Sequence, residues 1–209
     1  MKKPFTGRTY DVNNKKYPSV TSIIHPDGID FPEFLLKQYA SRGSAVHAVV
    51  ESYLLTGKMP VYEDVIDKKD LHILRNGSRR LDVWDCKIQG FFIKHGKRLI
   101  PTMLEEKLIN HEHGYAGRAD IIGLFDNVLS MMDIKTSSNY DEKKLTDYWM
   151  QQAAYIHCLN LKPKQMVILP INPKDERGYG DPIVCDEVDK YFSLFLEKLK
   201  YFNDNYEIK

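Results

Sequence analysis

Three consecutive runs of strand-like sequence, followed by a helical run and one more strand, constrain the fold of this chain most strongly. In order, these segments are Thr102 to Ile109, Tyr115 to Phe125, Val128 to Lys135, Lys143 to Leu161 and Gln165 to Ile171. The second and third strands meet at Asp126-Asn127, a pair suited to a tight hairpin turn. A strand that follows a crossover helix can join a sheet in parallel, so this order predicts an α/β core with a central mixed β-sheet flanked by helices.

The residues before this core are mainly helical in pattern. A short hairpin is expected at Arg8 to Val12 and Lys16 to Val20, turning at Asn13-Asn14. Ser19 or Thr21 can cap a short helix after it. Longer helical patterns span Phe31 to Leu55 with a break at Arg42-Gly43, about Asp67 to His95, and, at the end of the chain, Glu187 to Tyr206. We therefore expect one domain over 1–209, helical over 1–100 and built on the strands over 101–209.

Composition narrows the class of protein without identifying it. Hydrophobic residues make up 43% and charged residues 28% of the 209 residues, as in a globular protein that can bury a core. The formal net charge is +1, so attraction for a polyanion has to come from a local patch. Neither an apolar leader after the first lysines nor a stretch of membrane-spanning length occurs. The expectation is a cytoplasmic protein with no membrane contact.

Acidic residues and a lysine fall on all three consecutive strands. They are Glu105 or Glu106 on the first, Asp120 on the second, and Asp133 and Lys135 on the third. Side chains two apart share one face of a strand, so Asp133 and Lys135 point the same way and Ile134 points into the opposite layer. Taken singly, a strand-end aspartate is more often a turn residue, and an Asp-x-Lys pair is more often a solvated ion pair.

Together these residues suit a hard divalent ion. Such ions prefer carboxylate and carbonyl oxygens, which Asp120, Asp133 and the Ile134 carbonyl could supply. Phosphodiester hydrolysis needs an ion of this kind to neutralise charge and to lower the pKa of the attacking water. Lys135 would orient or deprotonate that water, or offset charge that develops on the phosphate.

Three short motifs resemble those of a known nuclease superfamily. They are GRAD at Gly117 to Asp120, DIKTSS at Asp133 to Ser138 and QQAAY at Gln151 to Tyr155. They look like the PD-(D/E)XK nucleases of the RecB-type branch, whose strands carry G-x-x-D and D-x-K-T before a helix with Q-x-x-x-Y. Upstream, YPSVTSII from Tyr17 and RGSAVHAVVESYL from Arg42 are similar to the mitochondrial genome maintenance exonucleases and related phage nucleases.

The resemblance implies a PD-(D/E)XK, restriction-endonuclease-like core and a Mg²⁺- or Mn²⁺-dependent DNA exonuclease. Single-stranded DNA ends are the favoured substrate, in replication, recombination or repair within a bacterial or phage-infected cell. Two alternatives stay open, namely a structure- or sequence-selective endonuclease and a non-catalytic DNA-binding protein on the same fold. The first proline of the superfamily motif is replaced, because Ala119 precedes Asp120.

Site roles follow from the same resemblance. Those implied are catalytic for Lys135, Asp120, Asp133 and Glu105, metal-binding for His47, Asp120, Asp133 and the Ile134 carbonyl, and substrate-binding for Thr136, Ser137, Gln151 and Tyr155. A lone helical histidine is more often a packing residue, but Glu51, one turn later, could fix the tautomer of a ligand at His47. Gln151 and Tyr155 lie on one helix face, although Tyr155 could equally be a core residue. Glu105 is preferred over Glu106 because it lies twelve residues before Gly117.

The cysteines exclude the cluster-containing members of that branch. Cys86, Cys158 and Cys185 are scattered and form no CxxC pair, so they suggest neither a disulfide framework nor a four-thiolate site. No helicase signature GxxxxGK[ST] is present either. The expected type is therefore a stand-alone exonuclease without an iron–sulfur cluster.

Overall fold

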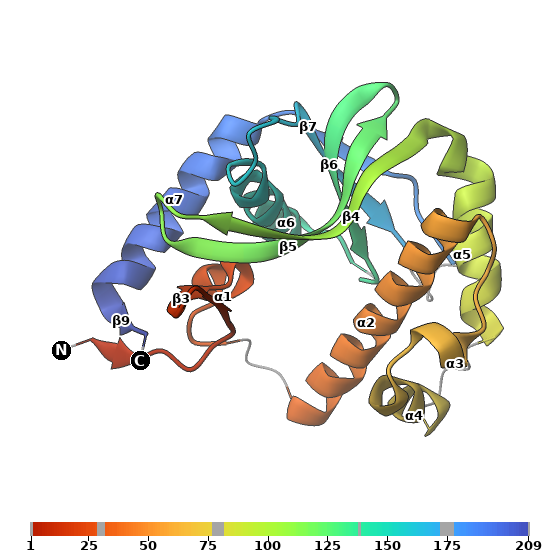
Figure 1. Ribbon diagram of the computed structural model, residues 1–209, viewed down its shortest axis with the longest axis horizontal. Helices are drawn as coiled ribbons and strands as arrows, with labels where there is room; N and C mark the ends of the chain where they lie inside the picture. Colours follow the sequence, from red (N-terminus) through yellow and green to blue (C-terminus); the bar gives the residue numbers. More distant parts are fainter. Residues whose placement is uncertain (1, 29–31, 77–81, 138, 172–177, 209) are drawn as a thin grey trace.

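A computed structural model places the four predicted core strands in one five-stranded sheet with helices on both faces (Figure 1). The structure describes residues 2–28, 32–76, 82–137, 139–171 and 178–208, and within these it describes no side chains over 73–86. The helices are α1 (Val20–Ile24), α2 (Glu33–Thr56), α3 (Tyr62–Val65), α4 (Lys68–Asn76), α5 (Asp82–His95), the short 3₁₀ turn Gly96–Arg98, α6 (Glu142–Ile156) and α7 (Val188–Asn205). The strands are β1 (Lys3–Pro4), β2 (Thr9–Val12), β3 (Lys15–Pro18), β4 (Leu99–Asn110), β5 (Tyr115–Phe125), β6 (Val128–Lys135), β7 (Gln165–Pro170), β8 (Ile183–Cys185) and β9 (Tyr206–Glu207).

The sheet is mixed, as the order of segments predicted. Its strand order is β4-β5-β6-β7-β8, with β6 and β7 parallel and the other neighbours antiparallel. The β5–β6 hairpin turns at Asp126 and Asn127, whose φ angles of 49° and 65° are the left-handed values that a two-residue turn requires. The α/β class with a mixed sheet is thus confirmed, whereas the short edge strand β8 was not predicted.

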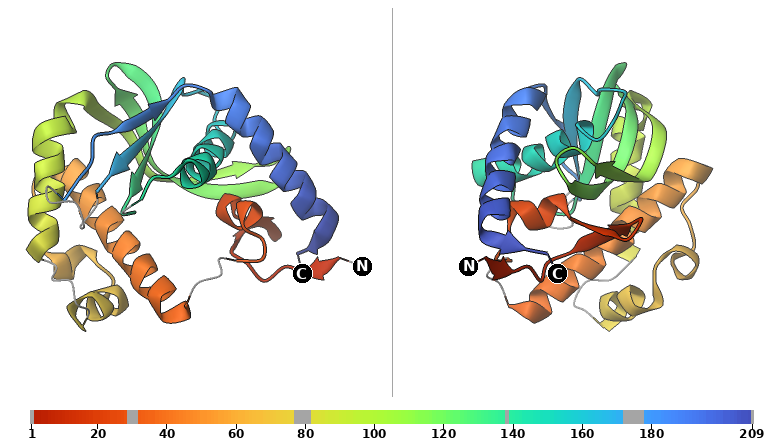
Figure 2. Two further views of the ribbon diagram at one scale, coloured as in Figure 1. Left: turned by 180° about the vertical axis from the view of Figure 1, so that it is seen from behind. Right: turned by 60° about the vertical axis from the view of Figure 1, so that its left-hand side comes forward.

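Two apolar cores lie on opposite faces of the sheet. One joins the sheet to α1, α6 and α7, and the other joins it to α2 and α5 (Figure 2). Neighbours along the central strands alternate between them, since Met131 and Met166 enter the first core and Met132 and Val167 the second. Burying one side chain of this size contributes roughly 1.5–3 kcal/mol, so both cores are needed to hold the sheet between its helices.

Helix α2 differs from its prediction at one point. A break was expected at Arg42-Gly43, but the helix runs unbroken from Glu33 to Thr56. A glycine inside a helix costs only about 1 kcal/mol, and burial of Ala45, Val46 and Val49 in the second core outweighs that cost. The helix ends at Thr56, one residue after the predicted Leu55, where Gly57 takes the left-handed conformation with φ 69°.

The helical pattern from Asp67 to His95 was predicted as one segment. The described residues contain two helices there, α4 and α5, and residues 77–81 between them lie outside the described part of the chain. Helix α3 was not predicted. Cys86 belongs to α5, but its side chain also lies outside the described residues, whereas Cys158 and Cys185 are free thiols.

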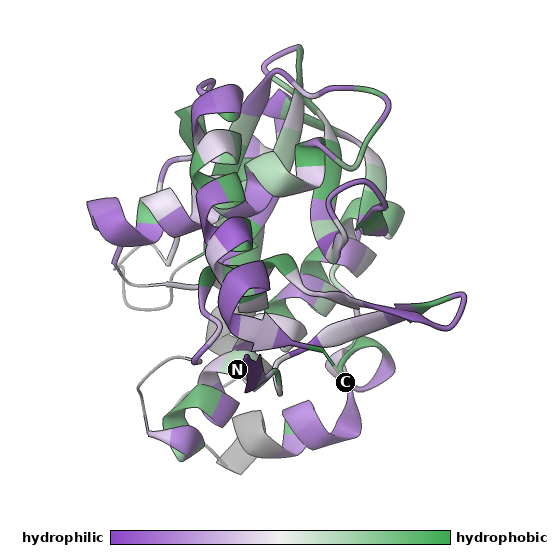
Figure 3. Ribbon diagram, turned by 90° about the vertical axis from the view of Figure 1, so that its left-hand side faces the viewer, coloured by the Kyte–Doolittle hydropathy of each residue, from purple (hydrophilic) through white to green (hydrophobic). Residues whose placement is uncertain are grey.

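The N-terminal hairpin and the cap after it are confirmed. Strands β2 and β3 turn at Asn13 and Asn14 with φ 50° and 61°, and the Ser19 hydroxyl accepts a hydrogen bond from the Ser22 amide at the start of α1. Strand β1 pairs in parallel with β9, so the two ends of the chain lie side by side (Figures 1 and 2). The outward face of α7 is largely hydrophilic (Figure 3). Among the described residues, no helix combines the length and apolar character that crossing a membrane requires.

Strands β5 and β6 separate part of the way along the sheet. Their pairing runs from Phe125 opposite Val128 to Ile121 opposite Met132, while the first half of β5 stays paired with β4. On the side where β6 has separated, the first half of β5 contacts the N-terminal segment. There Ser19 forms an isolated parallel β-bridge with Ala116. The fork that opens between β5 and β6 begins at Asp120 and Asp133, the two aspartates of the sequence motifs.

Candidate metal and catalytic site

Asp120 occupies the point where the two strands part. Its Oδ2 accepts a hydrogen bond from the Ile134 amide at 2.8 Å, which replaces the backbone partner that β6 lacks there. The side chain is buried, with 8% of its surface exposed. A buried carboxylate requires compensating donors or cations. The other oxygen of Asp120, Oδ1, faces a cation.

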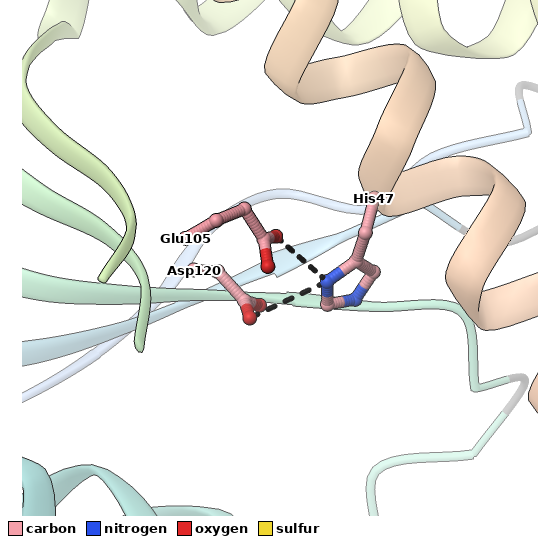
Figure 4. A group of neighbouring side chains, drawn as sticks. All are labelled: His47, Glu105 and Asp120. Carbon is pink, nitrogen blue, oxygen red and sulfur yellow. Dashed lines mark ion pairs between the residues drawn. The ribbon is translucent and has the colours of Figure 1, made fainter. Parts of the chain in front are cut away.

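That cation is His47, which α2 brings across the sheet face. Its Nδ1 lies 3.3 Å from Asp120 Oδ1 and 3.5 Å from Glu105 Oε1. The ring points from α2 toward both carboxylates (Figure 4). One ligand atom from each of His47, Glu105 and Asp120 lies within 4.8 Å of the others, so the three residues could hold a metal ion. The structure therefore brings together residues from a helix and two strands that are far apart in sequence.

The backbone at Glu105 decides which first-strand acid enters this group. Glu105 has a left-handed φ of 51° inside β4, and it lies opposite Asp120, between the pairs Leu104–Ile121 and Glu106–Ala119. A non-glycine residue in this region costs roughly 1–3 kcal/mol and is typical of functional sites. Glu105 is 13% exposed and enters the site, whereas Glu106 faces solvent. Of the two acids considered from sequence, the structure places Glu105 in the group.

The other ring nitrogen of His47 faces the backbone of β6. His47 Nε2 lies 3.1 Å from the Ile134 carbonyl oxygen, so Nε2–H can donate there, and Nδ1 can bind a metal ion once it has lost its proton. The sequence assigned this orienting role to Glu51 and assigned the Ile134 carbonyl to the metal. In the structure the carbonyl holds the histidine, although its second lone pair stays available as an acceptor.

Asp133 and Lys135 share one face of β6, as the period of a strand predicts. Lys135 Nζ lies 2.6 Å from Asp133 Oδ2 and donates a hydrogen bond to Gln151 Oε1 at 3.1 Å. Gln151 Nε2 in turn donates to the Tyr155 hydroxyl at 3.0 Å. This chain of contacts fixes the ammonium group at the fork. Gln151 and Tyr155 therefore help to hold Lys135, and because both also line the cavity at the fork, their assignment to the substrate stays a prediction.

The charges of the site perturb one another's ionisation. Burial opposes a charged His47, but the Asp120 and Glu105 carboxylates outweigh it and raise the pKa of His47 to about 10. Burial also opposes the ionised form of Asp120, yet the His47 charge holds the pKa of Asp120 below its ordinary value. For Asp133, burial and the Asp120 charge prevail over Lys135 and raise its pKa to about 6. A cation bound near Asp133 would favour its ionised form, because an opposite charge nearby stabilises a carboxylate.

The two residues after Lys135 do not join the site. Thr136 accepts a hydrogen bond from Arg42 Nη2 through its backbone carbonyl, at 3.2 Å. The Ser137 hydroxyl donates to the Asn139 carbonyl within a local turn, at 2.7 Å. Neither residue lines the cavity at the fork. The structure therefore gives their predicted contact with phosphate no support, and it stays a prediction.

Several contacts of the site were not predicted from sequence. Arg118 Nε lies 2.8 Å from Glu105 Oε2, and the Tyr140 hydroxyl donates to the Lys135 carbonyl at 3.1 Å. Lys135 Nζ also lies 4.5 Å from the centre of the Tyr148 ring. Arg118 stands inside the GRAD motif and could have been inferred from it. Tyr140 and Tyr148 carry no such signal, because their position depends on how α6 packs.

Gly117 of the GRAD motif lies directly against Tyr155 of the QQAAY motif. A Cβ atom at Gly117 would overlap the Tyr155 ring, so glycine leaves the room in which that ring lies. We expect Gly117→Ala to displace Tyr155, loosen Gln151 and lower the free energy of unfolding by about 1–3 kcal/mol. Denaturant unfolding of the variant against Gly43→Ala, a helix glycine with ordinary φ and open space around its added Cβ atom, measures this effect. Equal stability of the two variants would contradict the proposed role of Gly117.

A cavity of about 300 Å³ lies at the fork. His47, Asp120, Asp133 and Lys135 line it from the sheet and α2. Arg8, Tyr10 and Ser22 of the N-terminal segment line it from the other side. The site is thus a pocket that combines candidate ligands with cationic side chains.

Comparisons with known proteins do not extend this description. No family profile and no curated protein sequence matches the chain. One similar solved structure is the crystal structure of SSO0001, which is 16% identical, with 86% of this chain and 90% of that chain covered and a TM-score of 0.34. That degree of likeness supports no statement about function.

Proposed function

We propose that this chain is a divalent-metal-dependent deoxyribonuclease with a PD-(D/E)XK core of the RecB type. The observation that carries the proposal is the convergence of His47, Glu105 and Asp120 beside the Asp133–Lys135 pair at the fork of β5 and β6. The motifs GRAD and DIKTSS supply these aspartates and the lysine, and the helix with QQAAY holds the lysine in place.

The residues at the fork fit a hard or borderline cation. Two carboxylates and one imidazole suit Mn²⁺, and Mg²⁺ accepts the same carboxylates with more water. His47, Glu105 and Asp120 would hold the ion, and Asp133 lines the same cavity as a further oxygen donor. When bound, such an ion neutralises phosphate charge and lowers the pKa of an attacking water.

Lys135 is the residue proposed to act on the reacting phosphate. In hydrolysis a water gives up one proton as its oxygen bonds to phosphorus, the bond to the leaving oxygen breaks, and that oxygen takes up a proton. The Lys135 ammonium, fixed by Asp133 and Gln151, offsets the negative charge that grows on the phosphate during this step. Its position is set before substrate arrives, so little reorganisation is needed.

A single DNA strand suits the site better than a duplex. The cavity is small, and the N-terminal segment lies across it through Arg8, Tyr10 and Ser22. A lone strand can present its phosphate between this segment and the sheet, whereas an intact duplex needs a wider groove. We therefore propose an exonuclease that starts from single-stranded ends.

A comparison of linear and covalently closed DNA tests the proposed activity. Each form is supplied single-stranded and duplex, in Mn²⁺ and then in EDTA. We expect nucleotides to be released in Mn²⁺ from the linear single strand and from none of the other DNA forms. In EDTA we expect no release from any form. Cleavage of the closed circle would instead identify an endonuclease, and metal-dependent binding without any product would identify a non-catalytic DNA-binding protein.

A further inference from the structure

A second, larger cavity adjoins the one at the fork. Its volume is about 710 Å³, and it shares Thr21, Lys135 and Gln151 with the smaller cavity. The two are therefore neighbouring chambers that meet at the lysine proposed to contact the reacting phosphate. A cavity of this volume is within the range of small-ligand sites.

The larger chamber combines an aromatic ring with basic side chains. Tyr148 of α6 lines it, and Lys143 and Lys144 stand at the beginning of the same helix. Among the described residues, neither lysine has a carboxylate at ion-pair distance. The acidic residue that lines the chamber is Asp147. It contacts His25, whose Nε2 lies 3.2 Å from Asp147 Oδ2. The two ammonium groups are thus available to an anion from outside.

The side chains that line the chamber match one nucleotide unit. Aromatic side chains stack on any base, and lysines neutralise backbone phosphates without regard to sequence. Ile24 and the Tyr148 ring supply the apolar surface that a base requires. A strand whose reacting phosphate lies at Lys135 would place its neighbouring nucleoside in this chamber.

We propose that this chamber is a nucleotide subsite of the DNA strand. It holds the nucleoside adjacent to the cleaved phosphate against Tyr148, and the next phosphate along the strand pairs with Lys143 and Lys144. The inference rests on the proposed nuclease function, because it takes the strand to run through Lys135. The subsite would contribute to the affinity for the DNA strand through residues that do not belong to the metal centre.

Steady-state kinetics of the full chain in Mn²⁺ test the subsite. The substrate is a linear single-stranded oligodeoxythymidylate, and the variant is Lys143→Gln with Lys144→Gln. We expect KM to rise about tenfold and kcat to change by less than about threefold, because only strand binding is weakened. The slope of log affinity against log salt concentration should become shallower by about 0.7, because one phosphate of the single strand is no longer neutralised.

A matched pair of exposed lysines supplies the control. Lys162 and Lys164 precede β7, at the end of the sheet away from Asp133, and Lys162→Gln with Lys164→Gln removes the same charge. An unchanged KM and salt slope in the Lys143 and Lys144 variant, or equal changes in both double variants, would overturn the subsite while leaving the nuclease intact. Failure of the unaltered chain to cleave the oligonucleotide would instead overturn the proposed function.

Discussion

Replacement of Lys135 by methionine is expected to lower the rate of DNA cleavage about 10³-fold. Methionine fills similar space but carries no charge, so the growing charge on the phosphate is no longer offset by the cation that Asp133 and Gln151 hold in place. Single-turnover cleavage of a linear single-stranded oligonucleotide in Mn²⁺ measures this effect. Binding of the oligonucleotide should weaken far less than the rate falls, because the interaction strengthens in the transition state.

Folding has to be separated from chemistry in this experiment. Removal of Lys135 leaves Asp133 without its partner in a buried site, and breaking a buried ion pair in this way costs roughly 3–5 kcal/mol of stability. Lys135→Arg keeps a cation beside Asp133, so it should fold, yet its planar head cannot reproduce the ammonium geometry. We expect the cleavage rate to fall at least about 100-fold in that variant and to stay unchanged in Lys164→Met. Full activity of both Lys135 variants would remove the lysine from the mechanism.

Replacement of Asp120 by asparagine is expected to remove most of the stabilisation of the fold by Mn²⁺. In the unaltered chain, Mn²⁺ at about 100 times its dissociation constant should raise the free energy of unfolding by about 2.7 kcal/mol. A site weakened about 100-fold would leave only about 0.4 kcal/mol at the same concentration. Denaturant unfolding with and without Mn²⁺ measures the difference, and cleavage should be abolished in parallel.

Asparagine is chosen because it retains the structural contact of Asp120. Its amide oxygen can still accept the hydrogen bond from the Ile134 amide, so the fork is kept while the charge is removed. The control is Asp186→Asn, which alters an exposed aspartate after β8. Equal stabilisation by Mn²⁺ in both variants would show that the ion binds elsewhere.

Local periodicity was sufficient to predict part of this site. The period of two along β6 put Asp133 and Lys135 on one face, and the ion pair between them follows from it. The spacing of four along α6 likewise put Gln151 and Tyr155 together, and they share a hydrogen bond. Contacts of this kind depend only on the element to which the residues belong.

Other features depend on how distant elements meet. His47 was proposed through resemblance, and its distance from Asp120 depends on how α2 packs on the sheet. The left-handed φ of Glu105 has no signature in a run of strand-like residues, so the choice between Glu105 and Glu106 required the structure. The wrong break at Gly43 has a similar cause, because burial of the helix face overrode a local preference.

Joint measurement of Mn²⁺ binding and DNA cleavage tests the proposed metal-dependent activity most directly. The unaltered chain and Asp120→Asn are titrated with Mn²⁺, and release of nucleotides from a linear single strand is followed beside binding of the ion. We expect cleavage and binding to rise with the same midpoint in the unaltered chain. In the variant, binding should require about 100-fold more Mn²⁺ and cleavage should be absent. Cleavage that persists in EDTA, or that survives in Asp120→Asn, would contradict the assignment of the metal to this site.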